Sequence, residues 1–312
     1  TLRVSAVIAH PQAEQRLLLQ QLLRALRRAA VLHRQEGHHI GRVFNVDARQ
    51  LGIRQQQEKF YQRAENEKKL LLSVGHVTGR TTFDKTISLE INPSLVYHTM
   101  NETMRPQFYS GCWEIEKTVP GEIFISQGDY PLKGFHYLLQ AMQEILQNCP
   151  EAHIKVAGIS VLGVNGIKSR IKIPAYGKYL RRLILKNRLE GKVRVLGNLS
   201  AEEMKREYLS AQIFVCPSAV ENSPNSVAEG QLLGVPVAAS RTGGIPDVVK
   251  DGVSGLLFEK GNVHELAACV SRILTDKQLA KELSASERET AAKLYNGENN
   301  YQKLIEIYQS IE

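Results

Sequence analysis

The sequence predicts an α/β protein built on doubly wound parallel sheets, and three observations support this. From residue 121 onward, short apolar runs rich in β-branched residues alternate with amphipathic segments of helical length. The chain has 312 residues, which is enough for two domains. Its composition, 43% hydrophobic and 23% charged, is that of a globular protein able to bury a sizeable core.

Six buried strands are expected in the second part of the chain. They are EIFIS (122–126), HIKVAG (153–158), KVRVLG (192–197), QIFVCPS (212–218), VPVAAS (235–240) and GLLFE (255–259). A stripe of apolar residues after Gly134 predicts a helix, and Ser200 with Glu203 forms a capping box ahead of another helix over 201–209. Because strand, crossover and parallel strand wind right-handedly, the alternation predicts a doubly wound domain.

The upstream part predicts a shorter series of the same kind. Strands are expected at 69–77 and 94–100, with helical segments over 81–91 and 102–113. Residues 35–65 are rich in glutamine and charge with little periodicity, and no structure is predicted for them. At the far end, helices are expected over 276–295 and 300–311, separated by a break at 296–300.

The net charge of +8 is concentrated near the start of the chain. Residues 1–60 hold ten Lys/Arg against four Asp/Glu, and 11–34 form a basic stretch with a leucine-rich face. We interpret this stretch as a helix that packs on a sheet, and peripheral contact with anionic lipid is the alternative. The scarcity of aromatic residues, 6%, argues against nucleic acid as a partner.

The four cysteines lie 37, 67 and 53 residues apart and form no metal-binding pair. They stand singly in apolar runs, as buried thiols do in a reducing compartment. No run is long enough to span a membrane and no secretion signal is recognisable. We therefore expect a cytoplasmic protein, with peripheral association at the inner membrane surface as the variant that the basic stretch allows.

The stretch 216–240 carries the clearest chemistry. It follows an expected strand and enters a helix around Pro224, so the helix start lies at the carboxyl edge of the sheet, where anions bind. Glu221 and Glu229 offer two carboxylates eight residues apart, one suited to a sugar and one to a diol such as a ribose. Two solvated glutamates are the alternative. The chain has no Walker A loop and no D-x-D, G-x-G-x-x-G or G-x-S-x-G motif, which favours chemistry without a metal.

These motifs resemble the retaining glycosyltransferases of family 4, the glycosyl transferases group 1. The resemblance rests on the two glutamates within PS-x-x-E and E-x4-G-x-P-V, the pair Lys133-Gly134, GGIPDVV and GLLFEKGN, in that order along the chain. One branch of the family in particular is similar to this chain in four local segments, GHVTGRTTFDK, NETMR, SQGDYPLKGFHYLL and ENSPNS. The family fold implied is the B-type, two Rossmann-like domains that face each other across a cleft.

The resemblance implies a role for each matching residue. Lys133 would pair with the diphosphate of a nucleoside diphosphate sugar and Glu221 would stand near the transferred sugar, so these two are the expected catalytic residues. Glu229 would hold the ribose hydroxyls. The remaining expected donor-binding residues, several of which can equally be turn residues, are Gln127, Gly128, Gly158, Leu196, Gly197, Ser223, Pro224, Asn225 and Ser226. Gly243-Gly244 is interpreted as a turn.

The sequence departs from the family pattern in two ways. Many members carry an arginine five or six residues before the lysine, where this chain has Gln127 and Gly128; Lys168, Arg170 or Arg241 could replace that charge. The N-terminal domain lacks a recognisable glycine-rich first unit and looks incomplete. The histidines there, which match no catalytic position and are interpreted as surface or packing residues, are His10, His33, His38, His39 and His76.

The resulting hypothesis is a retaining glycosyltransferase that moves a hexose-type unit from a nucleoside diphosphate sugar to a hydroxyl of a glycan or lipid-linked glycan, as in polysaccharide biosynthesis, without a metal or other cofactor. A non-catalytic sugar-nucleotide-binding subunit or an inactive fragment is the rival. The expected domains are an incomplete acceptor-side domain over 1–117 and a donor-binding domain over 118–299. The helix over 300–312 is expected to cross back onto the first.

Overall fold

The computed structural model describes residues 46–158 and 175–311. The chain divides into two compact units, Thr1–Thr99 and Met100–Glu312, which are treated separately below. The predicted boundary at residues 117 and 118, and the packing of the last helix on the N-terminal domain, stay predictions. The predicted basic amphipathic stretch at 11–34 lies outside the described residues.

The described part of the first unit holds one βαβ unit and a long helix. Helix α2 (Val46–Ser73) precedes β1 (His76–Gly79), α3 (Thr82–Ile91) and β2 (Val96–Thr99), and the two strands pair in parallel. Helix α3 begins at a capping box formed by Thr81 and Asp84. Asn92 ties α3 to α2 by donating to the Leu71 carbonyl at 2.8 Å.

Two secondary-structure predictions upstream of residue 121 are wrong. Residues 69–73, expected in a strand, form the last turn of α2, and that helix also covers much of the segment 35–65 for which no structure was expected. An apolar run as short as KLLLSV fits a helix end as well as a strand. The expected helix over 102–113 is reduced to two short 3₁₀ turns nearby, η1 (Pro106–Tyr109) and η2 (Ile115–Lys117).

The second unit is built on a six-stranded parallel sheet that matches the prediction strand by strand. The strands are β3 (Glu122–Ile125), β4 (His153–Ala157), β5 (Val193–Gly197), β6 (Ile213–Cys216), β7 (Val237–Arg241) and β8 (Leu256–Glu259). Their order in the sheet is β5-β4-β3-β6-β7-β8, and all pair in parallel. The apolar side chains of the strands other than β5 are buried on both faces, which explains their apolar runs, whereas those of the outer strand β5 are half-buried.

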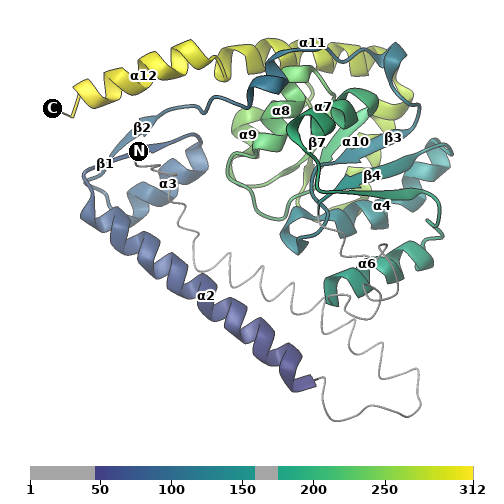
Figure 1. The fold of residues 1–312 in the computed structure, drawn as a ribbon, viewed down its shortest axis with the longest axis horizontal. Helices are drawn as coiled ribbons and strands as arrows, with labels where there is room; N and C mark the ends of the chain where they lie inside the picture. The colour runs from purple at the N-terminus through teal and green to yellow at the C-terminus, as the bar shows by residue number, and fades with distance from the viewer. Residues whose placement is uncertain (1–45, 159–174, 312) are drawn as a thin grey trace. The chain divides into compact units, whose positions relative to one another are not determined.

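Helices cover both faces of this sheet. The described helices of the second unit after η2 are η3 (Pro131–Lys133), α4 (Phe135–Asn148), α6 (Ala175–Lys186), α7 (Ala201–Ser210), α8 (Asn225–Leu233), α9 (Ile245–Val248), α10 (Val263–Thr275), α11 (Lys277–Leu294) and α12 (Gly297–Gln309), of which not all lie on the sheet. Helices α4 and α10 pack together on one face and α7 and α8 on the other, with α11 outside α8 (Figure 1). The predicted capping box of Ser200 and Glu203 begins α7. Asn296 caps α12, so the break between the last two helices falls at Tyr295 and Asn296.

Candidate functional site

The strand order predicts where a ligand binds: at the centre of the carboxyl edge of the sheet, the side on which the parallel strands end. Strands β3 and β6 are neighbours, and the chain proceeds from β3 to β4 on one side and from β6 to β7 on the other. In open parallel sheets, ligands bind where the strand order reverses in this way. The segment after β3 carries Lys133 and the segment after β6 carries Glu221.

Two backbone contacts hold these segments together. The Ala219 amide donates to the Leu132 carbonyl at 2.7 Å. Gly134 has a φ of 72°, and a Cβ on it would lie 1.8 Å from the Pro217 carbonyl oxygen, so only glycine allows the two segments to approach this closely. The lysine of the Lys133-Gly134 pair is thereby brought to the loop that carries the first glutamate.

Lys133 and Glu221 form an ion pair in which Nζ lies 2.6 Å from Oε2. Ser218 donates to the same oxygen at 3.2 Å. Burial acts to lower the pKa of Lys133, but the charge and hydrogen bond of Glu221 outweigh it, and the pKa is raised. The lysine side chain keeps 30% of its surface exposed, so its charge remains accessible to an anion.

The backbone of Glu221 is fixed by the turn at Gly243 and Gly244. The Gly244 amide donates to the Glu221 carbonyl at 3.2 Å, and a Cβ on Gly243 would lie 1.7 Å from that carbonyl oxygen. The interpretation of this glycine pair as a turn is confirmed. The turn acts on the site by positioning the first glutamate.

Helix α8 presents the second glutamate. The helix begins at Asn225 with Pro224 as its N-cap, and the Pro224 carbonyl accepts from the Val227 amide at 3.0 Å. Glu229 is the fifth residue of the helix and is buried. Its carboxylate is held by Arg105, whose Nε lies 2.7 Å from Oε1 and whose Nη2 lies 2.9 Å from Oε2. Burial raises the pKa of Glu229, and the guanidinium acts in the opposite direction.

The other expected donor-binding residues lie at the carboxyl ends of neighbouring strands. Gln127, exposed, and Gly128, buried, follow β3; Gly158 follows β4 with a φ of 109°; Leu196 and Gly197 end β5. The Gly158 amide donates to the Gly197 carbonyl at 2.9 Å. Ser223 and Pro224 are buried just before α8, while Asn225 and Ser226 open it. Among the predicted site residues, Lys133 forms an ion pair with Glu221. Glu229 instead pairs with Arg105, which the sequence analysis did not single out.

Arg105 is that missed residue. It lies within NETMR, which contributed to the family resemblance, but no local pattern connects it with a glutamate 124 residues later. Of the three cations considered for the diphosphate, Arg241 pairs with Asp251 and Glu259 at 2.8 and 3.0 Å. Lys168 and Arg170 lie outside the described residues.

The predicted surface or packing histidines include one that the structure describes. His76 on β1 stacks on His98 on β2, with ring centroids 5.2 Å apart, within the first unit. His10, His33, His38 and His39 lie outside the described residues. In the described part of the chain, no cluster of three or more His, Cys, Asp or Glu is arranged to hold a metal ion. None of the described helices is long and apolar enough to cross a membrane.

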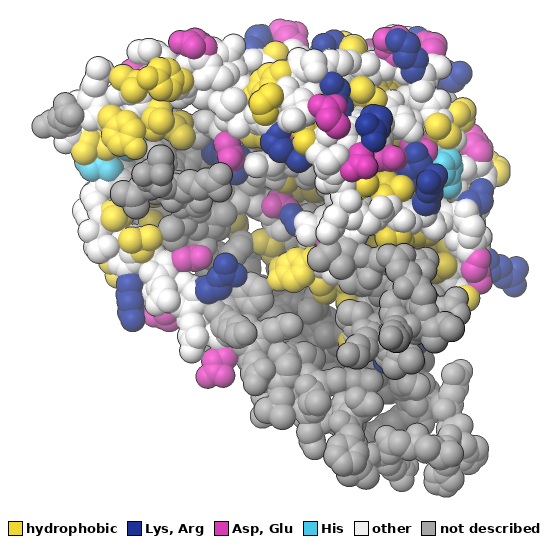
Figure 2. All heavy atoms as spheres, in the orientation of Figure 1, with side chains coloured by type: hydrophobic (Ala, Val, Ile, Leu, Met, Phe, Trp, Pro, Cys, Tyr) yellow, Lys and Arg dark blue, Asp and Glu magenta, His cyan; other side chains and the backbone are white. Residues whose placement is uncertain are grey.

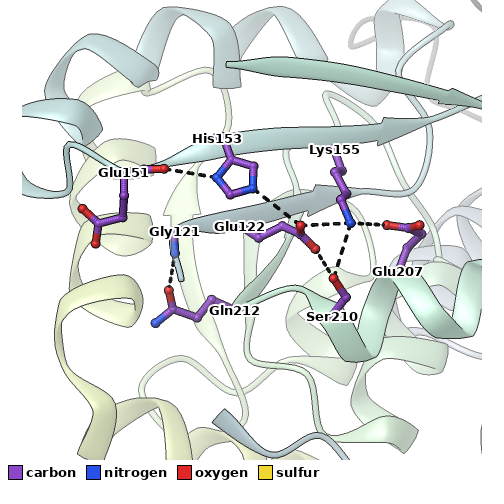
Figure 3. A network of polar contacts seen from close by, with 8 residues as sticks. All are labelled: Gly121, Glu122, Glu151, His153, Lys155, Glu207, Ser210 and Gln212. Carbon is purple, nitrogen blue, oxygen red and sulfur yellow. Dashed lines mark hydrogen bonds and ion pairs between the residues drawn. The ribbon is translucent and has the colours of Figure 1, made fainter. Parts of the chain in front are cut away.

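A second polar network occupies the opposite edge of the sheet (Figure 3). Glu122, the first residue of β3, accepts from Lys155 at 2.9 Å and from Ser210, and His153 lies 3.5 Å away. Lys155 also pairs with Glu207 at 2.9 Å. These residues come from the amino ends of β3 and β4 and from the end of α7, far along the strands from the loops that carry Lys133 and Glu221.

The comparisons with known proteins bear on the same unit. The family model of glycosyl transferases group 1 matches residues 115–290, more than half of the chain. The chain belongs to this family. The match contains Lys133, Glu221 and Glu229, whereas Arg105 precedes it.

Individual curated relatives match somewhat more than half of this glycosyltransferase family member. The D-inositol 3-phosphate glycosyltransferase of Corynebacterium urealyticum is 31% identical over 180 residues, 58% of this chain and 41% of that protein. The same-named protein of Nocardioides is 30% identical over 185 residues, 57% of this chain and 39% of that protein. The chain thus spans about two fifths of the length of the curated relatives it matches.

Solved structures share the fold. Anabaena Alr3699/HepE, determined in complex with UDP-glucose, matches with a TM-score of 0.67 and 18% identity over 80% of this chain and 68% of that one. Sucrose-phosphate synthase from Thermosynechococcus elongatus matches with a TM-score of 0.67 and 20% identity over 80% and 62%. These likenesses confirm the predicted α/β fold class with Rossmann-like domains, the class of the B-type glycosyltransferases.

Proposed function

We propose that this chain carries the donor site of a retaining glycosyltransferase, which moves a sugar from a nucleoside diphosphate sugar to a hydroxyl of a glycan or lipid-linked glycan. The observation that carries the proposal is the arrangement at the reversal of strand order. There, Lys133, Glu221, the start of α8 and Glu229 come from the loops after β3 and β6 and from the helix that follows. A cation and a helix start suit a diphosphate, and carboxylates suit sugar and ribose hydroxyls.

The chemistry follows from these placements. When the diphosphate leaves, its negative charge grows while the sugar becomes cationic. Lys133 and the backbone amides at Ser223, Asn225 and Ser226 would stabilise that charge without reorganising. Glu221 would stand beside the sugar, and Glu229 would accept from the ribose diol. We expect the acceptor hydroxyl to attack from the face that the diphosphate leaves, with no metal and no further cofactor.

Binding and turnover by the 312-residue chain test this proposal separately. Thermal shift against UDP-, GDP- and ADP-glucose would show which nucleotide stabilises the fold, because stabilisation grows with concentration over Kd. Glu229→Gln should weaken the shift, and 5 mM EDTA should leave it unchanged. If none of these nucleotides, with or without its sugar, stabilises the parent chain, the donor site is wrong.

A non-catalytic sugar-nucleotide-binding subunit is the second candidate. Gln127 stands where many family members carry an arginine, so the diphosphate would meet one cation fewer. Release of free nucleoside diphosphate from the bound sugar nucleotide, measured with and without a panel of sugar acceptors, separates the two. Binding without any release would favour the subunit.

The distribution of charge on the surface bears on whether the protein can reach a lipid-linked acceptor at a membrane. On the face that Figure 2 shows, the described Lys and Arg side chains are interspersed with Asp and Glu side chains. We propose a peripheral contact with anionic membrane only for the basic stretch at 11–34, because the positive charge of the chain is concentrated near its start. Salt-sensitive flotation with anionic vesicles, present in the parent chain and lost when the arginines of 11–34 are replaced by glutamine, would support it.

A further inference from the structure

Arg105 holds the second glutamate of the site in a geometry with little freedom. Its Nε and Nη2 atoms each donate to a different oxygen of the Glu229 carboxylate, at 2.7 and 2.9 Å. Such a planar, two-point contact fixes both the rotation and the direction of a carboxylate, which a single ammonium contact does not. Each oxygen retains a second lone pair that can accept a hydroxyl.

The segment that carries Arg105 is itself anchored. Pro106 follows it, which favours the extended backbone observed at Arg105, with φ −61° and ψ 138°. The guanidinium lies over the ring of Phe108, 4.8 Å from its centroid, and that ring is fully buried against Tyr208. Tyr109 closes the segment, since its hydroxyl accepts from the Met104 amide at 2.9 Å and donates to the Tyr295 carbonyl at 2.6 Å.

The contact with Arg105 affects the protonation of Glu229. Burial alone would favour the protonated acid, which has lost one acceptor, and the guanidinium favours the carboxylate. Titratable or charged groups on the elements packed against α8 include Tyr208 on α7, Arg288 and Glu287 on α11, and Arg241 at the end of β7. Burial raises the pKa of Tyr208 well above its ordinary value, so this group stays neutral. Glu287 is buried, and burial raises its pKa, so it is the competing carboxyl that the test must separate from Glu229.

We infer that Arg105 is a positioning residue for the donor: its two-point contact keeps the Glu229 carboxylate ionised and oriented to accept the two hydroxyls of the ribose diol. This inference rests on the proposed function. It adds a determinant from outside the matched family region, held by a segment that reaches α8 from before the sheet begins. Arg105 would act through Glu229 and need not contact the donor.

The test measures nucleotide affinity by calorimetry between pH 5.5 and 8.5. The probes are the ribonucleoside diphosphate that the parent binds best and its 2′-deoxy counterpart. The variants are Arg105→Gln, Arg105→Lys, Glu229→Gln and the double variant Arg105→Gln/Glu229→Gln. Lys281→Gln is the matched control: it breaks the ion pair between Lys281 on α11 and Glu116 in η2 and should bind like the parent.

We expect Arg105→Gln to weaken ribonucleotide binding about tenfold at pH 7. The loss should grow as the pH falls, because Glu229 without its guanidinium takes up a proton at higher pH. Arg105→Lys should recover part of the charge effect but not the orientation. The deoxy probe should lose much less, and the double variant should bind no worse than Glu229→Gln, since both changes remove the same contact.

Other results would overturn the inference. If Arg105→Gln binds like the parent at every pH, Arg105 only fastens its segment to α8. If the pH slope of Arg105→Gln persists in the double variant, the titrating group is Glu287 and not Glu229. Should Arg105→Gln fail to fold, Arg105→Lys decides: parent-like affinity and pH profile would then refute an orienting role. A parent chain that binds no nucleotide would instead refute the proposed function itself.

Discussion

Partly buried ion pairs lie at both ends of the parallel strands, the amino edge and the carboxyl edge of the six-stranded sheet. The two edges differ in how completely these pairs are enclosed by protein. At the amino edge, Glu122 has 1% of its side chain exposed, and its partner Lys155 also contacts Glu207. At the carboxyl edge, the described ion pairs of Glu221 and Glu229 are with Lys133 and Arg105, which are 30% and 47% exposed, against 15% for Lys155. A closed network stabilises the fold, whereas a half-open pair can also serve a ligand.

The energetic consequence follows from desolvation. A charge enclosed by protein cannot be compensated by water when its partner is removed, so breaking such a pair is costly. A cation that is one third to one half exposed regains water on losing its partner, and the cost to stability is small. Variants at the amino edge should therefore affect folding, and variants at the carboxyl edge should affect binding and turnover.

The largest effect is expected at the amino edge. Lys155→Met leaves the buried Glu122 carboxylate without its main partner, and we expect the free energy of unfolding to fall by about 3–5 kcal/mol. Urea unfolding measures this, and nucleotide affinity measured below the unfolding transition should not change. Lys293→Met, which breaks an exposed pair with Glu289, is the control and should cost less than about 0.5 kcal/mol. A small loss for Lys155→Met would mean that the amino edge is as open as the carboxyl edge.

At the carboxyl edge, Lys133→Ala should reduce the rate of sugar transfer by about 10²–10³-fold, because the leaving diphosphate carries most charge in the transition state. Donor affinity should fall less than the rate does. Stability should fall less than for Lys155→Met, because the Glu221 carboxylate that is left behind is 15% exposed and keeps its hydrogen bond from Ser218, whereas that of Glu122 is 1% exposed. Steady-state kinetics with calorimetry separates the two quantities. Equal losses in affinity and rate would assign Lys133 to ground-state binding alone.

One contribution to the pH dependence of stability should come from His136, beside the carboxyl edge, and the buried Glu287, whose pKa is raised, acts in the opposite direction. His136, in the first turn of α4, is buried, which lowers its pKa to about 4, whereas an unfolded histidine titrates near ~6.5. Between these values the unfolded chain binds a proton that the folded chain does not, so stability falls as the pH drops from ~6.5 to 4, by about 3 kcal/mol in all. Above pH ~6.5 this contribution is constant.

Urea unfolding at pH 7.5 and pH 5 measures that effect. His136→Gln should flatten the difference between the two pH values, while His153→Gln, in the amino-edge network, serves as the matched control. If His153→Gln flattens the difference instead, the acid sensitivity belongs to the amino edge and the comparison is reversed.

The smallest of these effects is expected for Glu229→Gln. The change keeps the volume of the side chain and removes its charge, so donor affinity should fall about tenfold to a hundredfold, or about 1.5–3 kcal/mol. Stability should change little, because the Arg105 side chain that loses its partner is half exposed. Calorimetric titration with the best-binding nucleotide checks this, and unchanged affinity in a folded variant would return Glu229 to a structural role.

Local pattern was sufficient for much of the second unit. The six strands lie within one or two residues of the predicted ranges, because each buried strand is a short β-branched run between turn residues. The capping box at Ser200 could be predicted for the same reason, since Ser200 and Glu203 are three residues apart. The strand prediction failed at 69–73. This short apolar run has no helical or strand periodicity of its own, and it ends a helix that begins in a segment without periodicity.

The sequence by itself determined the parallel sheet of the second unit, the family, and the residue types at the carboxyl edge, since each depends on neighbours within about ten positions. Only the tertiary structure decided which charges meet. Lys133 reaches Glu221 across 88 residues and Arg105 reaches Glu229 across 124. Such pairs follow from the strand order and from the close approach at Gly134, because a side-chain contact between distant segments depends on how the sheet is assembled and leaves no spacing in the sequence.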